Sequence, residues 1–100
     1  MIEQSYFLTL IRSSNVNKMQ ELINEENFIT LTNEFFPKTL GLLKYDMFIF
    51  LYNYVDKNNL YYNQYGSYTY IQHATLNPDY RLLEYFINEN DKPSTFQPSL

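Results

Sequence analysis

The chain repeats itself with a period of 32 residues. Apolar residues recur at this interval in two neighbouring columns, Leu22, Tyr54 and Phe86, followed by Ile23, Val55 and Ile87. A polar, turn-like segment follows each of the three. A fixed period of about 20 to 50 residues is typical of stacked supersecondary units. The sequence therefore predicts a short array of similar units.

Each unit is predicted to contain a helix, a turn and a second helix. The third shows this best: a helix over 71–76, a turn at 77–79 in which Asn77 caps the next helix with Pro78 at its first position, and a second helix. The apolar stripe of that second helix consists of Leu82, Leu83, Phe86 and Ile87. This stripe should face the second unit, with Tyr85 pointing away.

The other two units follow with less regularity. In the second, Leu40 to Leu43 should form the first helix and Asp46 should cap a helix over about 47–55. In the first, a helix over 7–11 precedes a cap among residues 13–15. The predicted domain spans 1–91, with units at about 5–27, 37–59 and 69–91, linked by turn or strand segments, and a flexible tail at 92–100. Phe96 of the tail should cover the end of the array.

The third unit resembles an ankyrin repeat. Thr69, Ile71 and Ala74 match the capping threonine, buried leucine and small buried alanine of that family. Tyr70 and Gln72 depart from its TPLH motif, and in the second unit Leu42 occupies the small-residue position. The resemblance implies an all-α solenoid of about three ankyrin-like helix-turn-helix repeats with protruding inter-repeat loops. A plain helix bundle is the alternative.

Composition narrows the function classes. The net charge is −4 and the basic residues are scattered singly, so the clustered cations that nucleic-acid binding needs are missing. The chain has no cysteine, which excludes disulfides and thiolate metal sites. No apolar run is long enough to span a bilayer. We expect a cytoplasmic protein, in the host cytoplasm if the source is a virus.

Catalytic chemistry has little to use in this sequence. The one histidine, His73, is interpreted as a half-exposed helix residue, and no nucleophile or phosphate-binding motif is present. The acidic residues Glu21, Glu25 and Glu26 are interpreted as a solvated helix end. We therefore expect no enzyme activity, no cofactor and no bound metal.

Aromatic residues mark a candidate recognition surface. Five tyrosines lie within ten residues at 61–70, and the resemblance places them in an inter-repeat loop, with Phe35 and Phe36 in the equivalent preceding loop. Tyrosine offers a large, rigid contact area with a polar tip. The alternative is that these tyrosines belong to the core. The predicted partner-binding residues are Phe35, Phe36, Lys44, Tyr45, Tyr65, Tyr68, Tyr70 and Asn77.

Together these features favour a non-enzymatic protein-binding module. It would neutralise a protein partner by occlusion, as an immunity protein or a viral or phage inhibitor does, and its acidic balance favours a basic partner. It would be a monomer or weak homodimer. Two alternatives stay open. The chain could be an N-terminal fragment or scaffold of a larger ankyrin-repeat protein, or an acidic mimic of nucleic acid.

Overall fold

Most of the residues that the structure describes lie in helices. The structure, a computed structural model, describes residues 1–65 and 68–90. The predicted flexible tail at 92–100 therefore lies outside the described residues. The helices and strands are α1 (Gln4–Ser13), α2 (Val16–Gln20), α3 (Phe28–Lys38), α4 (Tyr45–Tyr52), α5 (Lys57–Tyr62), β1 (Gln64–Tyr65), β2 (Tyr68–Thr69), α6 (Tyr70–Thr75) and α7 (Arg81–Asn90).

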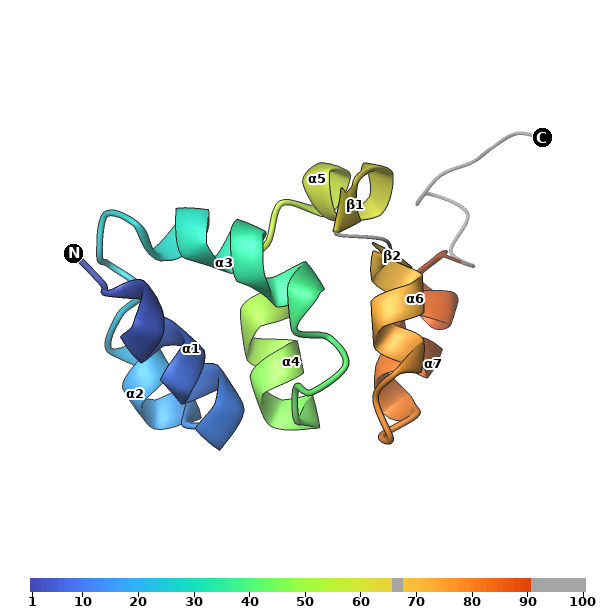
Figure 1. Ribbon diagram of the computed structural model, residues 1–100, viewed down its shortest axis with the longest axis horizontal. Coiled ribbons are helices and arrows are strands. Elements are labelled where there is room, and N and C mark those ends of the chain that lie inside the picture. The colour runs from blue at the N-terminus through green and yellow to red at the C-terminus, as the bar shows by residue number, and fades with distance from the viewer. Residues whose placement is uncertain (66–67, 91–100) are drawn as a thin grey trace.

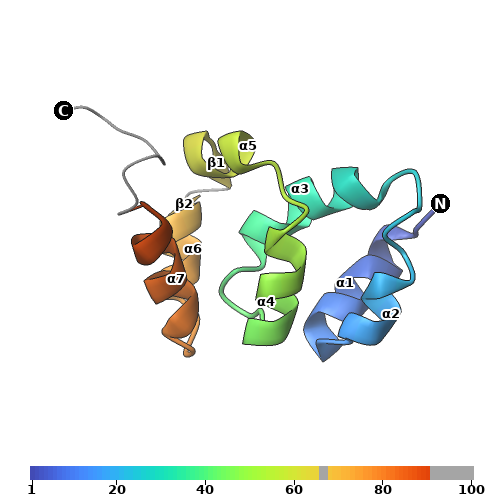
Figure 2. The ribbon, with the colours of Figure 1, turned by 180° about the vertical axis from the view of Figure 1, so that it is seen from behind.

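Two helix pairs lie at opposite ends of the molecule, with α4 between them (Figure 1). One pair is α1 with α2, and the other is α6 with α7. Seen from behind, α3 runs along one edge next to α5 and the β1–β2 hairpin (Figure 2). The turns that follow α1, α3 and α6 lie along the opposite edge. We call this second edge, formed by residues 13–16, 39–46 and 76–81, the turn edge.

The first helix pair agrees with the sequence prediction in its cap. Asn15 precedes α2, and its side chain accepts a hydrogen bond from the Lys18 backbone N–H at 3.1 Å. Helix α1 extends further in both directions than predicted. It ends at Ser13 and is followed by Ser14, whose φ of 53° lies in the left-handed region. A left-handed residue after the last turn is a common way to end a helix.

The middle of the chain differs most from the prediction. The segment expected to link the first two units is helix α3, and the predicted helix over Leu40 to Leu43 is a turn. Phe28, Leu31 and Phe35 recur at helical spacing and are buried, so this segment has the apolar face of a helix. A further helix is disfavoured by Gly41, because glycine is among the poorest helix formers.

Asp46 is predicted from the sequence to cap the helix, but α4 already begins at Tyr45, so this prediction is wrong. Asp46 lies in the first helical turn instead, where its carboxylate accepts hydrogen bonds from the Met47 N–H and the Ser14 hydroxyl, both at 2.8 Å. The Ser14 contact joins residues 32 positions apart, the period of the sequence repeat. It therefore ties the first turn of the turn edge to the second.

The helix pair of α6 and α7 begins with a side-chain cap. Thr69 caps α6 in a capping box, since its hydroxyl accepts from the Gln72 N–H while the Gln72 side chain accepts from the Thr69 N–H. Ala74 is buried. Helix α7 begins at Arg81, three residues later than predicted, because the side chains of Asn77 and Asp79 accept backbone hydrogen bonds that hold residues 77–80 in turns.

The segment before α6 combines a short helix with a hairpin. Asp56 caps α5 by accepting hydrogen bonds from the N–H groups of Asn58 and Asn59. The two-residue strands β1 and β2 then pair antiparallel, with Tyr65 opposite Tyr68. The predicted turn or strand character of 60–70 is thus confirmed for the hairpin, whereas its first residues belong to α5.

Aromatic rings dominate the contact between α4 and the last helix pair. The ring of Phe86 lies 5.4 Å from that of Phe48, 6.0 Å from Tyr52 and 4.9 Å from Tyr70, measured between centroids. Phe86 is fully buried. The prediction that Phe86 faces the second unit is therefore confirmed.

Helix α7 is rotated relative to the prediction. Tyr85, expected to point away, contacts the rings of Phe48 and Tyr52 at 5.4 and 5.2 Å. Ile87, expected on the inner stripe, is 50% exposed. The contact face is centred on Leu82 and Phe86 and shifts by roughly one residue step, about 100°, toward Tyr85. Aromatic partners on α4 select this face because they offer edge-to-face contacts to Tyr85.

Helix α5 is held against α4 by polar groups around Tyr52. The Tyr52 and Tyr61 hydroxyls share a hydrogen bond of 2.5 Å, and burial raises the pKa of both phenols. The Lys57 amine lies 4.3 Å from the centre of the Tyr52 ring and donates to the carbonyls of Tyr52 and Val55. Burial lowers the pKa of this amine. These contacts place Tyr61 partly in the core.

One buried hydroxyl on α3 predicts a stabilising substitution. Thr32 is fully buried, and its Oγ1 has no hydrogen-bond partner within the described residues. Replacing it with valine should raise the free energy of unfolding by about 1 kcal/mol, because a buried polar group without a partner is costly. Denaturant unfolding measures this change. Thr30→Val, at an exposed position of the same helix, should alter stability by less than about 0.5 kcal/mol. A destabilised Thr32→Val variant would contradict the unpartnered state of the hydroxyl.

Candidate binding surface

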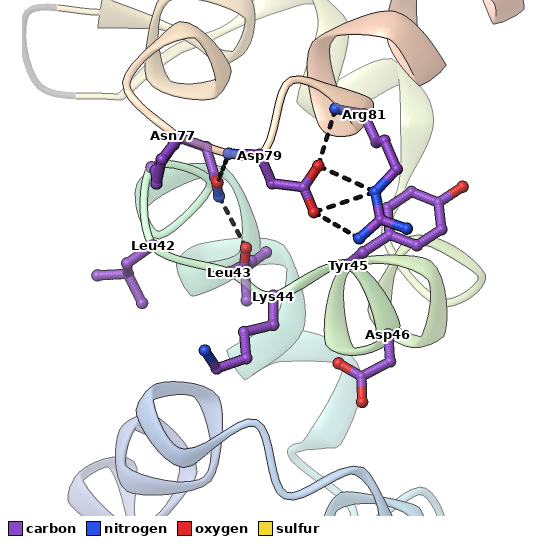
Figure 3. Close-up of a pocket in the computed structure, with 10 residues that line it drawn as sticks. Leu42, Leu43, Lys44, Tyr45, Asp46, Asn77, Asp79 and Arg81 are labelled. Atoms are coloured by element: carbon purple, nitrogen blue, oxygen red, sulfur yellow. Dashed lines mark hydrogen bonds and ion pairs between the residues drawn. The ribbon is translucent and has the colours of Figure 1, made fainter.

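A cleft opens at the turn edge between the α3–α4 turn and the α6–α7 turn (Figure 3). It encloses about 750 Å³. Its walls come from two chain segments more than 30 residues apart in sequence. They are formed by Gly41, Leu42, Leu43, Lys44, Tyr45, Asp46, Asn77, Pro78, Asp79 and Arg81.

Asn77 fixes the two walls relative to each other. Its side-chain amide donates hydrogen bonds to the carbonyls of Leu40 and Leu43, at 2.8 and 2.7 Å. Its Oδ1 accepts a third bond, from the Asp79 N–H at 2.8 Å. One side chain therefore satisfies backbone groups on both turns, which would otherwise lack partners in this partly buried place.

Gly41 allows the two turns to approach closely. A Cβ atom at this position would lie 3.1 Å from the Leu76 Cβ and 3.4 Å from the His73 carbonyl oxygen. Contacts this short leave no comfortable room for a side chain. The glycine therefore sets the spacing between the α3–α4 turn and the end of α6.

An ion pair stacked on an aromatic ring forms one side of the cleft. Asp79 accepts from the Arg81 Nε at 3.0 Å and from Nη2 at 2.7 Å, and the guanidinium lies 4.2 Å from the centre of the Tyr45 ring. Hydrogen bonds from the Arg81 side chain and backbone N–H lower the pKa of Asp79, and the carboxylate raises the pKa of Arg81. Both groups therefore stay charged and oriented at neutral pH.

The rim of the cleft carries exposed apolar groups beside a cation. Leu42 lines the cleft and is 51% exposed. Leu76 lies next to the lining residues, faces the Gly41 backbone and is 58% exposed. Lys44 is exposed, and none of the ion pairs found in residues 1–65 and 68–90 involves its amine. Figure 3 shows Leu42 and Lys44 directed away from the Asp79–Arg81 pair. Apolar groups next to polar ones at a fixed concave edge suit protein recognition.

The structure brings together three of the residues predicted from sequence. Lys44, Tyr45 and Asn77 all line the cleft. Tyr68 lies away from them, in β2 on the hairpin edge, and is 42% exposed. Tyr65 is in β1, but its side chain lies outside the described part of the structure.

The predicted loop positions of three aromatics are wrong. Phe35 and Phe36 are buried within α3, because the segment has a helical apolar face and supplies a large part of the core. Tyr70 begins α6 and is buried, with its ring 4.9 Å from Phe86 and 5.0 Å from Tyr61. For Tyr70 the core alternative holds. Phe35 and Phe36 also belong to the core, since a short chain needs its aromatics to complete the interior.

Sequence reasoning misses the leucines of the rim and the ion pair. The repeat pattern places Leu42 at a small buried position and Leu76 in a helix, whereas both lie at turns. The closeness of Asp79 and Arg81 in sequence, two residues apart beside Pro78, is a usable signal for a local pair. No sequence signal reveals the exposure of Leu42 and Leu76, because this exposure depends on how two turns far apart in sequence pack together.

A smaller hollow of about 400 Å³ lies at the opposite end of the molecule, lined by Met1, Ile2, Glu3, Tyr6, Leu22 and Glu25. The terminal amine pairs with the Glu25 carboxylate at 2.8 Å, and this contact raises the pKa of the amine.

His73 contacts the Tyr68 ring, with 5.4 Å between the ring centres. Among the described residues, no cluster of histidine or acidic side chains is arranged to hold a metal ion.

Within residues 1–65 and 68–90, no helix combines the length and apolarity needed to cross a membrane. Comparison of the chain with protein-family models, with curated proteins and with solved structures finds no significant match. The geometry of the cleft is therefore the basis for a functional assignment.

Proposed function

We propose that the protein is a protein-binding module whose turn-edge cleft receives a surface segment of its partner. The observation that carries this proposal is the exposure of two leucines, each more than half accessible: Leu42 in a wall of the cleft, and Leu76 beside it, next to the Gly41 backbone. Asn77 holds the two walls of the cleft in place. A rigid apolar rim binds at low entropic cost because few groups must be ordered on association. Tyr45 and Arg81, already stacked, are residue types that often dominate interface energies.

We also propose that the helix pairs form a divergent ankyrin-like stack. The capping box at Thr69, the buried Ala74 and the Ser14–Asp46 contact at the repeat period support this assignment. The middle unit departs from the family pattern because a turn replaces its first helix. In such arrays neighbouring units share one core and present an extended surface.

The biological role that fits this surface is neutralisation of a partner by covering a functional region. A small module with a preformed rim can occlude a site without chemistry of its own. Its net charge of −4 favours association with a basic protein. An immunity protein or a viral or phage inhibitor would act in this way.

Binding measurements show whether the partner contacts the cleft or the opposite edge of the molecule, which carries α5 and the β1–β2 hairpin and is called the hairpin edge. The double variant Leu42→Ser, Leu76→Ser should raise the Kd for a partner captured from the native cell at least about tenfold, equivalent to about 1.4 kcal/mol. Titration calorimetry measures the change, and the circular dichroism melt should stay nearly unaltered because both leucines are exposed.

The matched control is Tyr62→Ser, Tyr68→Ser on the hairpin edge, where both tyrosines are also exposed. This variant should bind with unchanged affinity. Loss of binding in the hairpin variant but not in the leucine variant would place the interface on the other edge and overturn the proposal.

A further inference from the structure

Lys44 brings an unmatched positive charge to the cleft. Both acidic and basic residues line the cleft, and two of them, Asp79 and Arg81, neutralise each other in an ion pair of 2.7 Å. The carboxylate of Asp46 is engaged as well, since it accepts two hydrogen bonds of 2.8 Å. Within the part of the chain that the structure describes, the Lys44 amine has neither an ion pair nor a hydrogen bond.

This charge lies beside the exposed leucines of the rim. Lys44 follows Leu42 closely in the α3–α4 turn, and Leu76 faces the backbone of Gly41, the residue before Leu42. In Figure 3 the Lys44 amine extends toward the side on which Leu42 lies, whereas the Asp46 carboxylate points the other way. The rim therefore combines a cation with aliphatic surface.

We propose that the partner segment carries an aspartate or glutamate beside an aliphatic residue, a proposal that rests on the role of the cleft as the binding site. The carboxylate pairs with the Lys44 amine in charge-assisted hydrogen bonds. The aliphatic side chain covers Leu42 and Leu76 and removes their apolar surface from water. The net charge of −4 acts over a longer range on the partner as a whole, so a basic protein with such a segment satisfies both preferences.

A carboxylate suits this site better than a phosphate or a cation. Phosphate carries up to two negative charges and is usually bound by clustered arginines, whereas the described residues that line the cleft offer one unmatched cation next to two carboxylates. A lysine or arginine of the partner would find Asp79 already paired with Arg81, and Lys44 would repel it. A single negative charge matches the charge of the site.

Two blocked peptides test the preference. Acetyl-Gly-Leu-Asp-Leu-Gly-amide and its analogue with asparagine in place of aspartate have nearly the same shape and differ by one charge. Titration of the full chain, followed by nuclear magnetic resonance of backbone amides and leucine methyl groups, gives a Kd for each peptide. The aspartate peptide should bind about two- to fivefold tighter at low ionic strength, as expected of an exposed ion pair. The preference should shrink in about 0.5 M salt, because salt screens exposed charges.

Lys44→Gln should abolish the preference, so that both peptides bind this variant equally. The variant should keep its circular dichroism melt, because Lys44 is exposed and its side chain does not cap α4. Lys18→Gln is the matched control: it makes the same change in net charge on α2, outside the cleft, where the Lys18 amine lies 4.0 Å from Glu21. This control should retain the preference. Its loss in both variants would show a general charge effect and overturn the proposal.

The position of the shifts separates this inference from the proposed function. Equal binding of the two peptides with shifts at Leu42, Lys44 and Leu76 overturns the carboxylate preference but leaves the cleft as the binding site. Shifts at Tyr62 and Tyr68 instead contradict both. No shift at the cleft with the aspartate peptide at about 10 mM also overturns the preference, since a Kd in the millimolar range would be detected.

Discussion

Replacing Phe86 with alanine should lower the free energy of unfolding by about 3 to 5 kcal/mol, the cost typical of truncating a buried phenylalanine. The side chain is fully buried, and three aromatic rings from α4 and α6 surround it. Urea denaturation followed by circular dichroism measures the loss, which is large for a domain of this size.

Ile87→Ala is the control for the orientation of α7. Because Ile87 is half exposed, its truncation should cost less than about 1 kcal/mol. If Ile87→Ala destabilised the protein as strongly as Phe86→Ala, the predicted stripe of Leu82, Leu83, Phe86 and Ile87 would be correct and the observed rotation of α7 wrong.

Removing the amide of Asn77 should cost about 2 to 4 kcal/mol, although no apolar core is disturbed. Asn77→Ala leaves the carbonyls of Leu40 and Leu43 and the Asp79 N–H without their side-chain partner. Each partly buried backbone group left unpaired costs roughly 1 to 3 kcal/mol, reduced where water can enter. Thermal and urea unfolding of the variant measure the sum.

Asn88→Ala serves as the comparison, because Asn88 is exposed on α7. Alanine is the better helix former, so this change should leave stability unaltered or slightly higher. An Asn77→Ala variant as stable as Asn88→Ala would mean that water replaces the lost bonds and that the cleft walls are held by other contacts.

The sequence predicts structure reliably where interactions within one short segment determine it. The caps at Asn15 and Thr69 and the turn after α6 follow from side chains that bond to the backbone nearby. The burial of Phe86 follows from periodicity. These features need no knowledge of distant residues, which explains why they can be predicted.

The errors occur where tertiary contacts decide. The helical face of α3 is present in the spacing of Phe28, Leu31 and Phe35, but the repeat frame assigns the segment to a link between units. The rotation of α7 depends on the rings of α4, which periodicity alone does not reveal. The cleft forms only where two distant turns meet. The sequence can therefore indicate single residues of the cleft, but not that they lie together.

Because α4 lies between the two helix pairs, one pair can unfold locally while the other stays folded. Helices α1 and α2 lie on one side of α4, and α6 and α7 lie on the other (Figure 1). The turn-edge hydrogen bonds join neighbours only: Ser14 to Asp46, and Asn77 to Leu40 and Leu43. In such a linear arrangement, fraying of one end does not break the contacts of the other. Opening of α6 and α7 would dismantle the cleft while α1 keeps its contacts with α3 and α2 those with α4. Retention of the first helix pair therefore does not guarantee an intact binding edge.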